Sequence, residues 1–351
     1  MTERILIVRL AALGDIVTTS VLLSRIRAER PGAEVTWLCA SAMQPLVELF
    51  EGVHRVVAVD EKRLFHGRGL DRIREVARVW WRLGRTHFDR ILIAHADRRY
   101  RMLVPAFAPD RVRMLDHGFP RMNPIAGRHF GDEYARLLDA PGNRGPVGVR
   151  YSVADVRPRL PSGSNDDDAP TVVLVPGGAR NMLRESALRR WPVERYRQLA
   201  DGLAALNVRV LLVGDRNDEW VRPHFVGSDV TDRLGTSIIE TLALLRDASL
   251  VISHDTGPMH LARLVRTPLL ALFGPTIPMQ VLPADADAEV LWGGASLPCR
   301  PCYDGRALAA CTDNRCMQTI SVGEVLERAK RVLTRNSARV EGASETPVGQ
   351  R

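Results

Sequence analysis

Short apolar runs alternate with amphipathic segments along most of this chain of 351 residues. The first half has apolar runs at residues 4–10, 35–38, 55–59 and 90–94, and helical spacing of apolar residues at 16–29, 45–50 and 70–83. Runs of this length are typical of buried strands. Strands that alternate with helices at this spacing form βαβ units around a parallel sheet. The pattern therefore predicts an α/β fold.

The same alternation begins again at residue 171. Predicted strands lie at 171–175, 208–213, 230–234, 249–252, 269–273 and 289–292, and predicted helices at 193–206, 238–246 and 322–333. Between them and the first series lies a polar, aperiodic stretch rich in Pro, Gly and Asp, which is typical of a linker. The predicted organisation is a domain at 1–155, a linker at 156–170, a domain at 171–320, a C-terminal helix at 321–335 and a disordered tail at 336–351.

The charge balance is basic, with a formal net charge of +8 that comes almost entirely from arginine. Such a skew reflects either genomic base composition or a surface that meets an anionic partner, namely nucleic acid, a membrane or a phosphorylated substrate. No zinc-finger, RNA-recognition or helix-turn-helix signature occurs, so we predict no nucleic-acid partner. No apolar run is long enough to span a membrane and the N-terminus lacks a signal-peptide pattern, so we expect a cytoplasmic protein.

The stretch at residues 253–260 predicts a strand–turn–helix unit. Thr256 and Gly257 would form the turn and Pro258 the first helical position. An N–H at that position has no partner within the helix, so proline loses nothing by lacking one. A helix N-terminus offers unpaired N–H groups and the positive end of the dipole, which suit a phosphate. Asp255 and His260 add two titratable groups. The alternative is an ordinary turn with a capping Asp and a surface His.

Open α/β sheets bind ligands at the carboxyl ends of their strands. We therefore expect a cleft in which the loop at Gly14-Asp15 faces the loops at Pro176–Gly178, Gly214-Asp215 and 255–257.

Four segments occur in an order that resembles a known family. They are 9–16 (RLAALGDI), 189–192 (RRWP), 255–262 (DTGPMHLA) and 273–276 (FGPT). Together they resemble glycosyltransferase family 9, the heptosyltransferases of bacterial lipopolysaccharide synthesis. The resemblance implies a GT-B fold, with two Rossmann-like domains facing a central cleft, the N-terminal one for the acceptor and the C-terminal one for the nucleotide-sugar donor.

The resemblance also implies an activity. It is transfer of a heptose, with inversion, from ADP-heptose to an inner-core lipopolysaccharide or related glycan, and it requires no metal cofactor. The partners would be an ADP-sugar and an anionic glycolipid, with peripheral contact at the cytoplasmic face of the inner membrane. A GT-B nucleotide-sugar epimerase, which would turn over without acceptor, and a non-catalytic nucleotide-sugar binding protein are the alternatives.

By the same resemblance Asp15 is the general base. An inverting transfer needs a carboxylate to take the proton of the attacking hydroxyl, although Asp15 also suits a cap for a helix that begins at Ile16. Thr256 and Gly257 would hold the donor diphosphate and Asp255 the sugar hydroxyls. His260 either contacts the donor or is packed and hydrogen-bonded.

Further residues follow from the motifs less directly. Arg189 stands where relatives carry a phosphate-binding Lys, and Arg190, Arg180 and Arg184 are its rivals. Glu219 is the candidate for the ribose hydroxyls, with Asp218 as the alternative. Arg63 and Arg98 lie in two basic loops of the N-terminal half and are candidates for acceptor binding, against the alternative of solvated surface arginines.

Four of the five cysteines follow a C-x2-C-x8-C-x4-C pattern: Cys299, Cys302, Cys311 and Cys316. Disulfides are not expected in a reducing cytosol. Thiolates with this spacing are able to hold a structural zinc ion. The pattern favours free thiols in a tight loop, with a zinc site as the alternative.

Overall fold

The structure is a computed structural model that describes residues 2–104, 109–115, 125, 127–140, 143, 145, 152–156, 160, 169–180, 185–282, 288–303 and 308–344. The chain forms two compact units. The first comprises Met1–Leu160 with Met279–Pro283, and the second comprises Pro161–Pro278 with Ala284–Arg351. Most of the predicted linker lies outside the described residues.

The first unit is built on a five-stranded parallel sheet of order β3-β2-β1-β4-β5. Its strands are β1 (Arg4–Val8), β2 (Glu34–Ala40), β3 (Arg55–Val59), β4 (Arg90–Ile93) and β5 (Val112–Met114). Its helices are α1 (Leu13–Thr19), α2 (Val21–Glu29), α3 (Gln44–Val47), α4 (Gly69–Leu83) and α5 (Phe130–Ala135). Short turns of helix are η1 (Ser41–Met43), η2 (Lys62–His66), η3 (Arg98–Leu103), η4 (Pro109–Arg111) and η5 (Arg136–Leu138). Residues 5–8 of the central strand β1 are fully buried, which explains the unbroken apolar run.

The helix predicted at 16–29 is divided into α1 and α2, and it begins earlier than expected, at Leu13. Asp15 therefore lies inside the first turn of α1 rather than in a loop before it. The division falls at Ser20, whose hydroxyl donates to the Val17 carbonyl at 2.6 Å. Thr18 makes a similar bond to the Gly14 carbonyl at 2.8 Å. Hydroxyls that bond to carbonyls of the preceding turn bend or interrupt helices.

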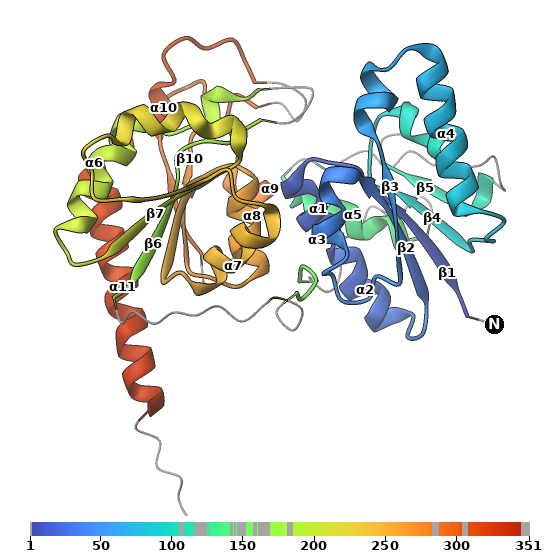
Figure 1. Ribbon diagram of the computed structural model, residues 1–351, viewed down its shortest axis with the longest axis horizontal. Coiled ribbons are helices and arrows are strands. Elements are labelled where there is room, and N and C mark those ends of the chain that lie inside the picture. The colour runs from blue at the N-terminus through green and yellow to red at the C-terminus, as the bar shows by residue number, and fades with distance from the viewer. Residues whose placement is uncertain are drawn as a thin grey trace, which may run out of the picture. The chain divides into compact units, whose positions relative to one another are not determined.

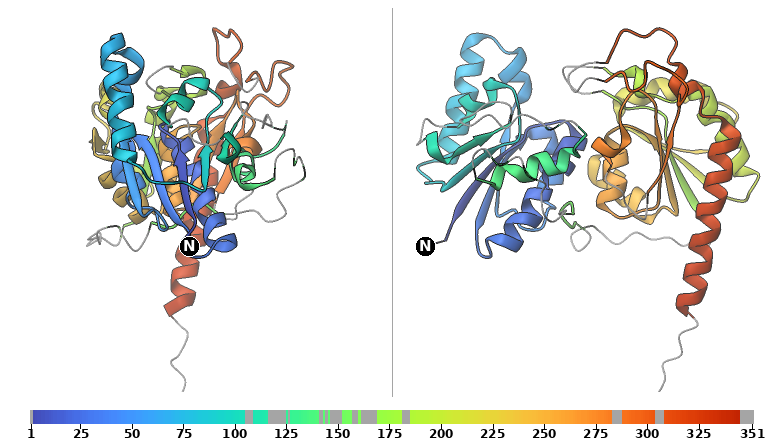
Figure 2. Two further views of the ribbon diagram at one scale, coloured as in Figure 1. Left: turned by 90° about the vertical axis from the view of Figure 1, so that its right-hand side faces the viewer. Right: turned by 180° about the vertical axis from the view of Figure 1, so that it is seen from behind.

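The second unit holds a six-stranded parallel sheet of order β11-β10-β9-β6-β7-β8. Its strands are β6 (Thr171–Val175), β7 (Arg209–Gly214), β8 (Thr231–Leu234), β9 (Leu250–His254), β10 (Leu269–Phe273) and β11 (Ala288–Trp292). Its helical segments are η7 (Ala187–Arg189), α6 (Val193–Ala204), η8 (Arg216–Phe225), α7 (Ile238–Asp247), α8 (Gly257–Leu264), α10 (Arg315–Gln318) and α11 (Val322–Ser344). The short helix α9 (Pro278–Val281) includes the point at which the chain passes from the second unit to the first. Helices α6 and α11 pack together on one face of the sheet, and α7 and α8 cover the other (Figures 1 and 2).

The last helix is longer than predicted. It continues from Val322 to Ser344, nine residues past the expected end at 335. The sequence from 336 to 344 contains Ala, Arg and Glu, which favour helix, so a polar composition alone was a poor guide to disorder there. In the part of the chain that the structure describes, every helix is too short or too polar to cross a membrane.

Each sheet reverses its strand order once. In the first unit the reversal lies between β1 and β4, and in the second between β6 and β9. In open parallel sheets, the loops that leave the carboxyl ends of strands at such a point diverge and leave room for a ligand. The predicted residues Asp15 and Asp255 follow β1 and β9, so the topology places each at a switch point.

Candidate functional site

The first unit holds Asp15 in a fixed position at the carboxyl end of β1. The guanidinium of Arg9 forms an ion pair with one carboxylate oxygen of Asp15, Oδ2. The hydroxyl of Tyr134, on α5, donates to the other oxygen, Oδ1, at 3.1 Å. About 39 % of the Asp15 side chain stays exposed. The carboxylate is therefore oriented by two side chains and still accessible.

Arg9 is itself held by buried groups. It donates to the Ala94 carbonyl at the end of β4, and 8 % of the residue is exposed. Burial lowers the pKa of Arg9, but the Asp15 carboxylate and two tyrosines more than offset this and raise the pKa above its usual value. A permanent cation thus sits beneath Asp15.

A stacked aromatic pair extends from this site. His95 lies flat against Tyr100, with ring centroids 3.5 Å apart. The Leu10 N–H donates to Nε2 of His95 at 3.2 Å. Burial, with the charge of Arg9, holds the pKa of His95 well below its usual value, so this histidine is neutral at neutral pH. Its Nε2 acts as an acceptor, and the proton is assigned to Nδ1.

The two predicted basic loops lie side by side. The ring of Phe65, in η2, meets Tyr100 edge-on at 5.7 Å, and the Arg99 guanidinium lies 5.0 Å from the Phe65 centroid. Arg63, also in η2, is exposed and pairs with Asp60 at 3.3 Å. Arg98 is exposed at the start of η3. The structure thus brings the two candidate acceptor-binding arginines to neighbouring loops near the Asp15 site.

In the second unit, the loop after β6 is tied to the turn after β9. The Ala179 N–H donates to the Thr256 hydroxyl at 2.8 Å. Gly178 has φ of +76°, and an added Cβ would collide with that hydroxyl. Thr256 is the N-cap of α8, which begins at Gly257, one residue before the Pro258 predicted as the first helical position. The N–H groups at this helix start, which have no partner within the helix itself, therefore face the edge where β6 and β9 end.

Asp255 is 4 % exposed and is held by two neighbours. The Thr276 hydroxyl, in the loop after β10, donates to Oδ2 of Asp255 at 2.8 Å. The Arg189 guanidinium lies 3.5 Å from the same oxygen. A buried carboxylate thus fixes an arginine beside the start of α8.

The structure separates Arg189 from its rivals. Arg190 donates twice to the Gly178 carbonyl, at 3.0 and 2.7 Å, and pairs with Glu185, so it braces the loop. Arg180 faces Glu185 at 3.6 Å, and Arg184 lies outside the described residues. Among the three of these arginines that the structure describes, Arg189 is the one whose guanidinium reaches the Asp255 turn, where it also lies 5.3 Å from the centroid of the Tyr303 ring.

Asp218 and Glu219 also have different environments. Asp218 is 3 % exposed, and its two oxygens accept the N–H groups of Gly178 at 2.8 Å and Asp215 at 3.0 Å. Burial raises the pKa of this carboxyl. Glu219 keeps 60 % of its side chain exposed and pairs with Arg222 at 3.3 Å. Asp218 therefore supports the glycine loop, and Glu219 stays the candidate for ribose binding.

Two histidines flank the turn. His260 lies on α8, one turn beyond Gly257, and is 7 % exposed, so a donor contact by its side chain stays a prediction. His254 is fully buried at the end of β9, with Nδ1 3.1 Å from the Tyr196 hydroxyl. Burial, together with the charges of Arg190 and Arg189, lowers the pKa of His254 to about 3.

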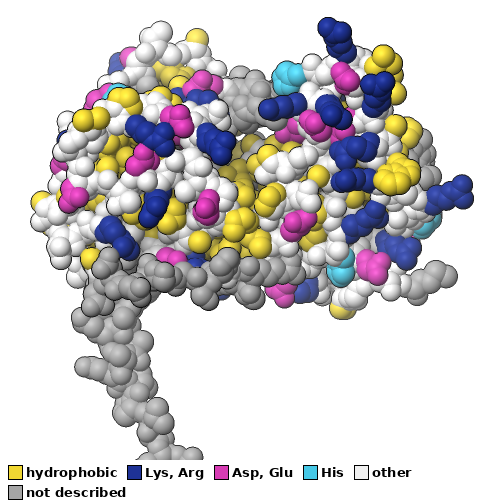
Figure 3. Space-filling model, viewed as in Figure 1, with side chains coloured by type: hydrophobic (Ala, Val, Ile, Leu, Met, Phe, Trp, Pro, Cys, Tyr) yellow, Lys and Arg dark blue, Asp and Glu magenta, His cyan; other side chains and the backbone are white. Residues whose placement is uncertain are grey.

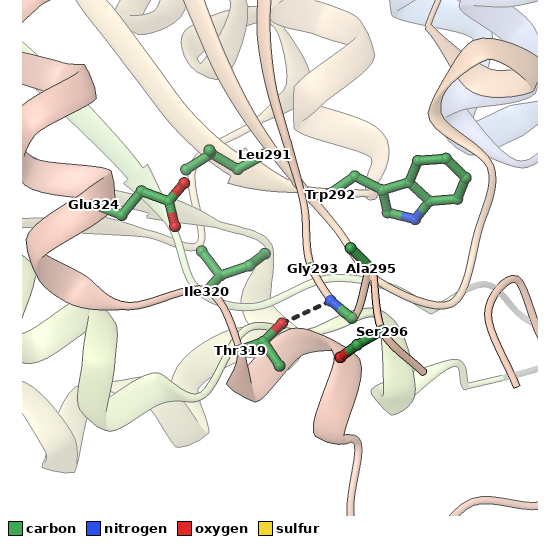
Figure 4. A pocket seen from close by; sticks show the side chains of 9 residues that line it. Leu291, Trp292, Gly293, Ala295, Ser296, Thr319, Ile320 and Glu324 are labelled. Carbon is green, nitrogen blue, oxygen red and sulfur yellow. Dashed lines mark hydrogen bonds between the residues drawn. The ribbon is translucent and has the colours of Figure 1, made fainter. Parts of the chain in front are cut away.

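A separate cavity of about 320 Å³ lies at the end of β11. It is lined by Leu291, Trp292, Gly293, Gly294, Ala295, Ser296, Thr319, Ile320 and Glu324 (Figure 4). The Thr319 hydroxyl accepts the Gly294 N–H at 2.7 Å across it. The lining contains none of the predicted site residues, so we do not assign the donor to this cavity.

Solved structures define the class of the fold. The glycosyl transferase family 9 structure from Veillonella parvula matches 95 % of this chain and 97 % of its own, with 20 % identity and a TM-score of 0.72. The E. coli heptosyltransferase WaaC with ADP-2-deoxy-2-fluoro heptose matches 94 % of this chain and 99 % of its own, with 18 % identity and a TM-score of 0.66. The two parallel-sheet units are therefore those of a GT-B glycosyltransferase fold, as predicted.

Sequence comparison finds relatives in one family. Residues 152–311 match the model of glycosyltransferase family 9 (heptosyltransferase). This match bears out the family resemblance of the three motifs that lie within these residues. Lipopolysaccharide heptosyltransferase 1 of Pseudomonas aeruginosa is 25 % identical over 325 residues, covering 85 % of this chain and 86 % of the relative. Lipooligosaccharide heptosyltransferase 2 of Haemophilus influenzae is 32 % identical over 111 residues, and this match spans about a third (32 %) of the relative's length.

The four clustered cysteines are free thiols. Burial, with a contribution from neighbouring thiols, raises the pKa of Cys302 and Cys316. No group of three His, Cys, Asp or Glu side chains within the described ranges is placed to hold a metal ion, so these ranges do not assemble the zinc site considered from the spacing. A related structure, the glycosyltransferase TibC of enterotoxigenic E. coli, is iron-containing; it is 14 % identical, with a TM-score of 0.60.

Sequence reasoning missed the residues that position others. Tyr134 lies 119 positions from Asp15, and nothing in the local sequence indicates their contact. Asp218 appeared only as a rival of Glu219. Arg9 and Thr276 stood inside the quoted motifs, at the ends of strands, and this position was the available signal for a site role.

Proposed function

We propose that the chain transfers a heptose from ADP-heptose to an inner-core lipopolysaccharide or a related glycan acceptor, with inversion at the anomeric carbon. The family assignment and the relatives named as lipopolysaccharide heptosyltransferases support this reaction class. The observation that carries the proposal is the arrangement of Arg189, Asp255, Thr256 and Gly257 around the start of α8. It is a site for a diphosphate in a GT-B donor domain.

The donor would bind the second unit. The N–H groups at the start of α8 would donate to oxygens of the diphosphate, and Arg189 would neutralise the charge that develops as ADP leaves. In this role a guanidinium supplies the positive charge that other transferases take from a metal ion, so we propose that no metal is required. Asp255 would orient Arg189, and Glu219 would bind the ribose. The related WaaC structure with a fluorinated ADP-heptose supports the choice of donor.

The acceptor would bind the first unit. Asp15 would take the proton of the attacking hydroxyl while that oxygen bonds to the anomeric carbon and ADP departs. Arg9 and Tyr134 hold the two oxygens of Asp15 and would fix the direction of attack. Arg63 and Arg98 would meet the negative groups of an anionic glycolipid. Closure of the two units would bring donor and acceptor together, and we place the reaction at the cytoplasmic face of the inner membrane.

The direct test supplies ADP-heptose and inner-core acceptor to the wild type and to Asp15→Asn. We expect a fall in kcat of about 100-fold or more, the usual contribution of a general base, with ADP affinity unchanged. Asp201→Asn, which alters an exposed carboxylate on α6, is the matched control. An Asp15→Asn enzyme within about tenfold of the wild type would remove Asp15 as the base, and ADP-heptose turnover without acceptor would indicate an epimerase instead.

A further inference from the structure

The solvent-facing side of α4 is apolar, although a different side of the same helix packs into the core. Leu70 and Ile73 are 68 % and 65 % exposed, and Trp81 is 81 % exposed. With Ala77 they follow the spacing i, i+3, i+7, i+11, which puts them on one stripe of a helix. We call this stripe, together with Trp80, the outer face of α4.

The core side of α4 is already complete. Val79 and Leu83 are buried, and Glu75 is buried where it accepts the Asp60 N–H at 2.7 Å. The indole N–H of Trp80 donates to the Met102 carbonyl at 3.0 Å, which holds this ring at the edge of the outer face. The exposed apolar residues are therefore not a core surface that lost its partner. Contiguous exposed apolar residues of this kind mark a site of interaction with a protein or a membrane.

Arginines run beside the outer face. Arg74, Arg78 and Arg82 recur at four-residue intervals, and Arg68 precedes the helix. Arg78 pairs with Glu75. Within the described residues Arg74 and Arg82 form no ion pair. Figure 3 shows dark-blue side chains interleaved with yellow ones over the part of the first unit that carries α4.

We propose that the outer face of α4 docks on a membrane surface that contains anionic phospholipid. Tryptophan prefers the boundary between headgroups and acyl chains, and helices with an apolar stripe flanked by Arg lie in that plane. Unpaired arginines are attracted to the negative headgroups. Charge also argues against a second copy as the occupant, because a two-fold dimer through this face would oppose the same arginines to one another.

The docking surface is connected to the acceptor-side loops. Helix α4 follows η2, the basic turn at the carboxyl end of β3, and Asp15 follows β1 at the same edge of the sheet. A membrane bound at α4 would hold this edge close to the lipid surface, where a glycolipid resides. The docking itself does not rest on the proposed transferase activity, and its test measures binding alone.

The test is flotation of the full-length protein with vesicles of phosphatidylcholine alone and with about one-third phosphatidylglycerol. We expect binding to the anionic vesicles that weakens with salt. Removing two arginines, in Arg74→Gln/Arg82→Gln, should weaken it about 25-fold, since each arginine near the surface contributes about fivefold. Replacing the apolar stripe, in Ile73→Asp/Trp81→Asp, should weaken it by about tenfold or more.

The matched control is Val226→Asp/Arg331→Gln, which makes the same kinds of change on exposed positions of the second unit. It should float like the wild type. Equal weakening in the control and the α4 variants would overturn the proposal, because net charge alone would then account for binding. So would absence of flotation, or equal binding to neutral vesicles. A concentration-dependent dimer that the Ile73→Asp/Trp81→Asp change abolishes, without vesicle binding, would assign the face to a second copy.

Discussion

The carboxylate of Asp218 supports the glycine loop of the proposed donor site, and its removal can be tested by a nearly isosteric change. Its two oxygens each accept one backbone N–H, from Gly178 at 2.8 Å and from Asp215 at 3.0 Å. In Asp218→Asn one oxygen becomes an NH₂ group, which donates. Whichever way the amide turns, one buried N–H then faces another donor. An unsatisfied buried donor costs about 1–3 kcal/mol.

The site has little room to relax. An added Cβ on Gly177 would collide with the Asp218 carboxyl, so the side chain lies directly against the loop backbone. One effect acts in the opposite direction, because burial raises the pKa of Asp218 and the neutral amide avoids that desolvation cost. We expect a net loss near the lower end of that range. For a folded unit of the size of the second unit, this loss of stability corresponds to a fall in Tm of roughly 2–6 °C. We also expect weaker ADP binding, because the loop supports the turn at Thr256.

The pH dependence gives a second readout. A carboxyl whose folded-state pKa is raised keeps its proton in the folded state while the unfolded chain has lost it. Stability therefore falls as the pH rises from the unfolded value of about 4 through the raised folded value. We expect this fall in the wild type and not in Asp218→Asn. The free energies of unfolding of the two proteins should therefore differ less at neutral pH than at low pH.

The assay is thermal unfolding across pH, with ADP titration calorimetry. Asp215→Asn is the control, because Asp215 is an exposed N-cap whose side chain accepts the Asn217 N–H at 2.6 Å, a role that asparagine fills well. If Asp218→Asn matched this control in Tm and in ADP affinity, the two buried hydrogen bonds would not support the loop as argued.

Two further predictions concern the same unit. Arg189→Gln should weaken ADP binding by about tenfold or more. Arg190→Gln should chiefly lower Tm, because Arg190 donates to the Gly178 carbonyl. If calorimetry found that Arg190→Gln weakened ADP binding more than Arg189→Gln, the phosphate-binding arginine would be reassigned. His254, with a folded pKa of about 3, contributes stability that is complete above its unfolded pKa of about 6.5 and is lost as the pH falls between the two. His254→Phe should therefore lose less stability on acidification. The measurement is denaturant unfolding at several pH values, and a free energy of unfolding that falls with pH as steeply as in the wild type would contradict the burial argument.

The quoted family motifs lie at the ends of strands in both units. The quoted motifs at 9–16, 255–262 and 273–276 all cover the exit from a parallel strand into a loop or helix. At such an exit the backbone N–H groups of the next helix and the side chains of the turn are available to a ligand. Each motif thus supplies the turn at the end of a strand that the core requires, where a bound ligand would have access to it.

The alternation of short apolar runs with amphipathic segments determined the fold class, because the runs indicate buried strands and the helical spacing of apolar residues indicates the helices between them. It also located the start of α8, since Gly257-Pro258 after a strand leaves few other conformations. The division at Ser20 and the continuation of α11 to Ser344 were missed. Both depend on weak local preferences, which a pattern of apolar residues does not record.

The tertiary structure decided which of several similar residues makes each contact. Arg189 and Arg190 are neighbours of the same chemistry, and their separation depends on which guanidinium reaches Asp255 and which reaches the Gly178 carbonyl. The contact of Tyr134 with Asp15 joins residues far apart in the chain. The sequence by itself determined the strands, the turns and the chemical groups at their ends. Only the packing of strand ends against one another determined which groups meet, because that depends on side-chain reach and burial across the sheet rather than on position along the chain.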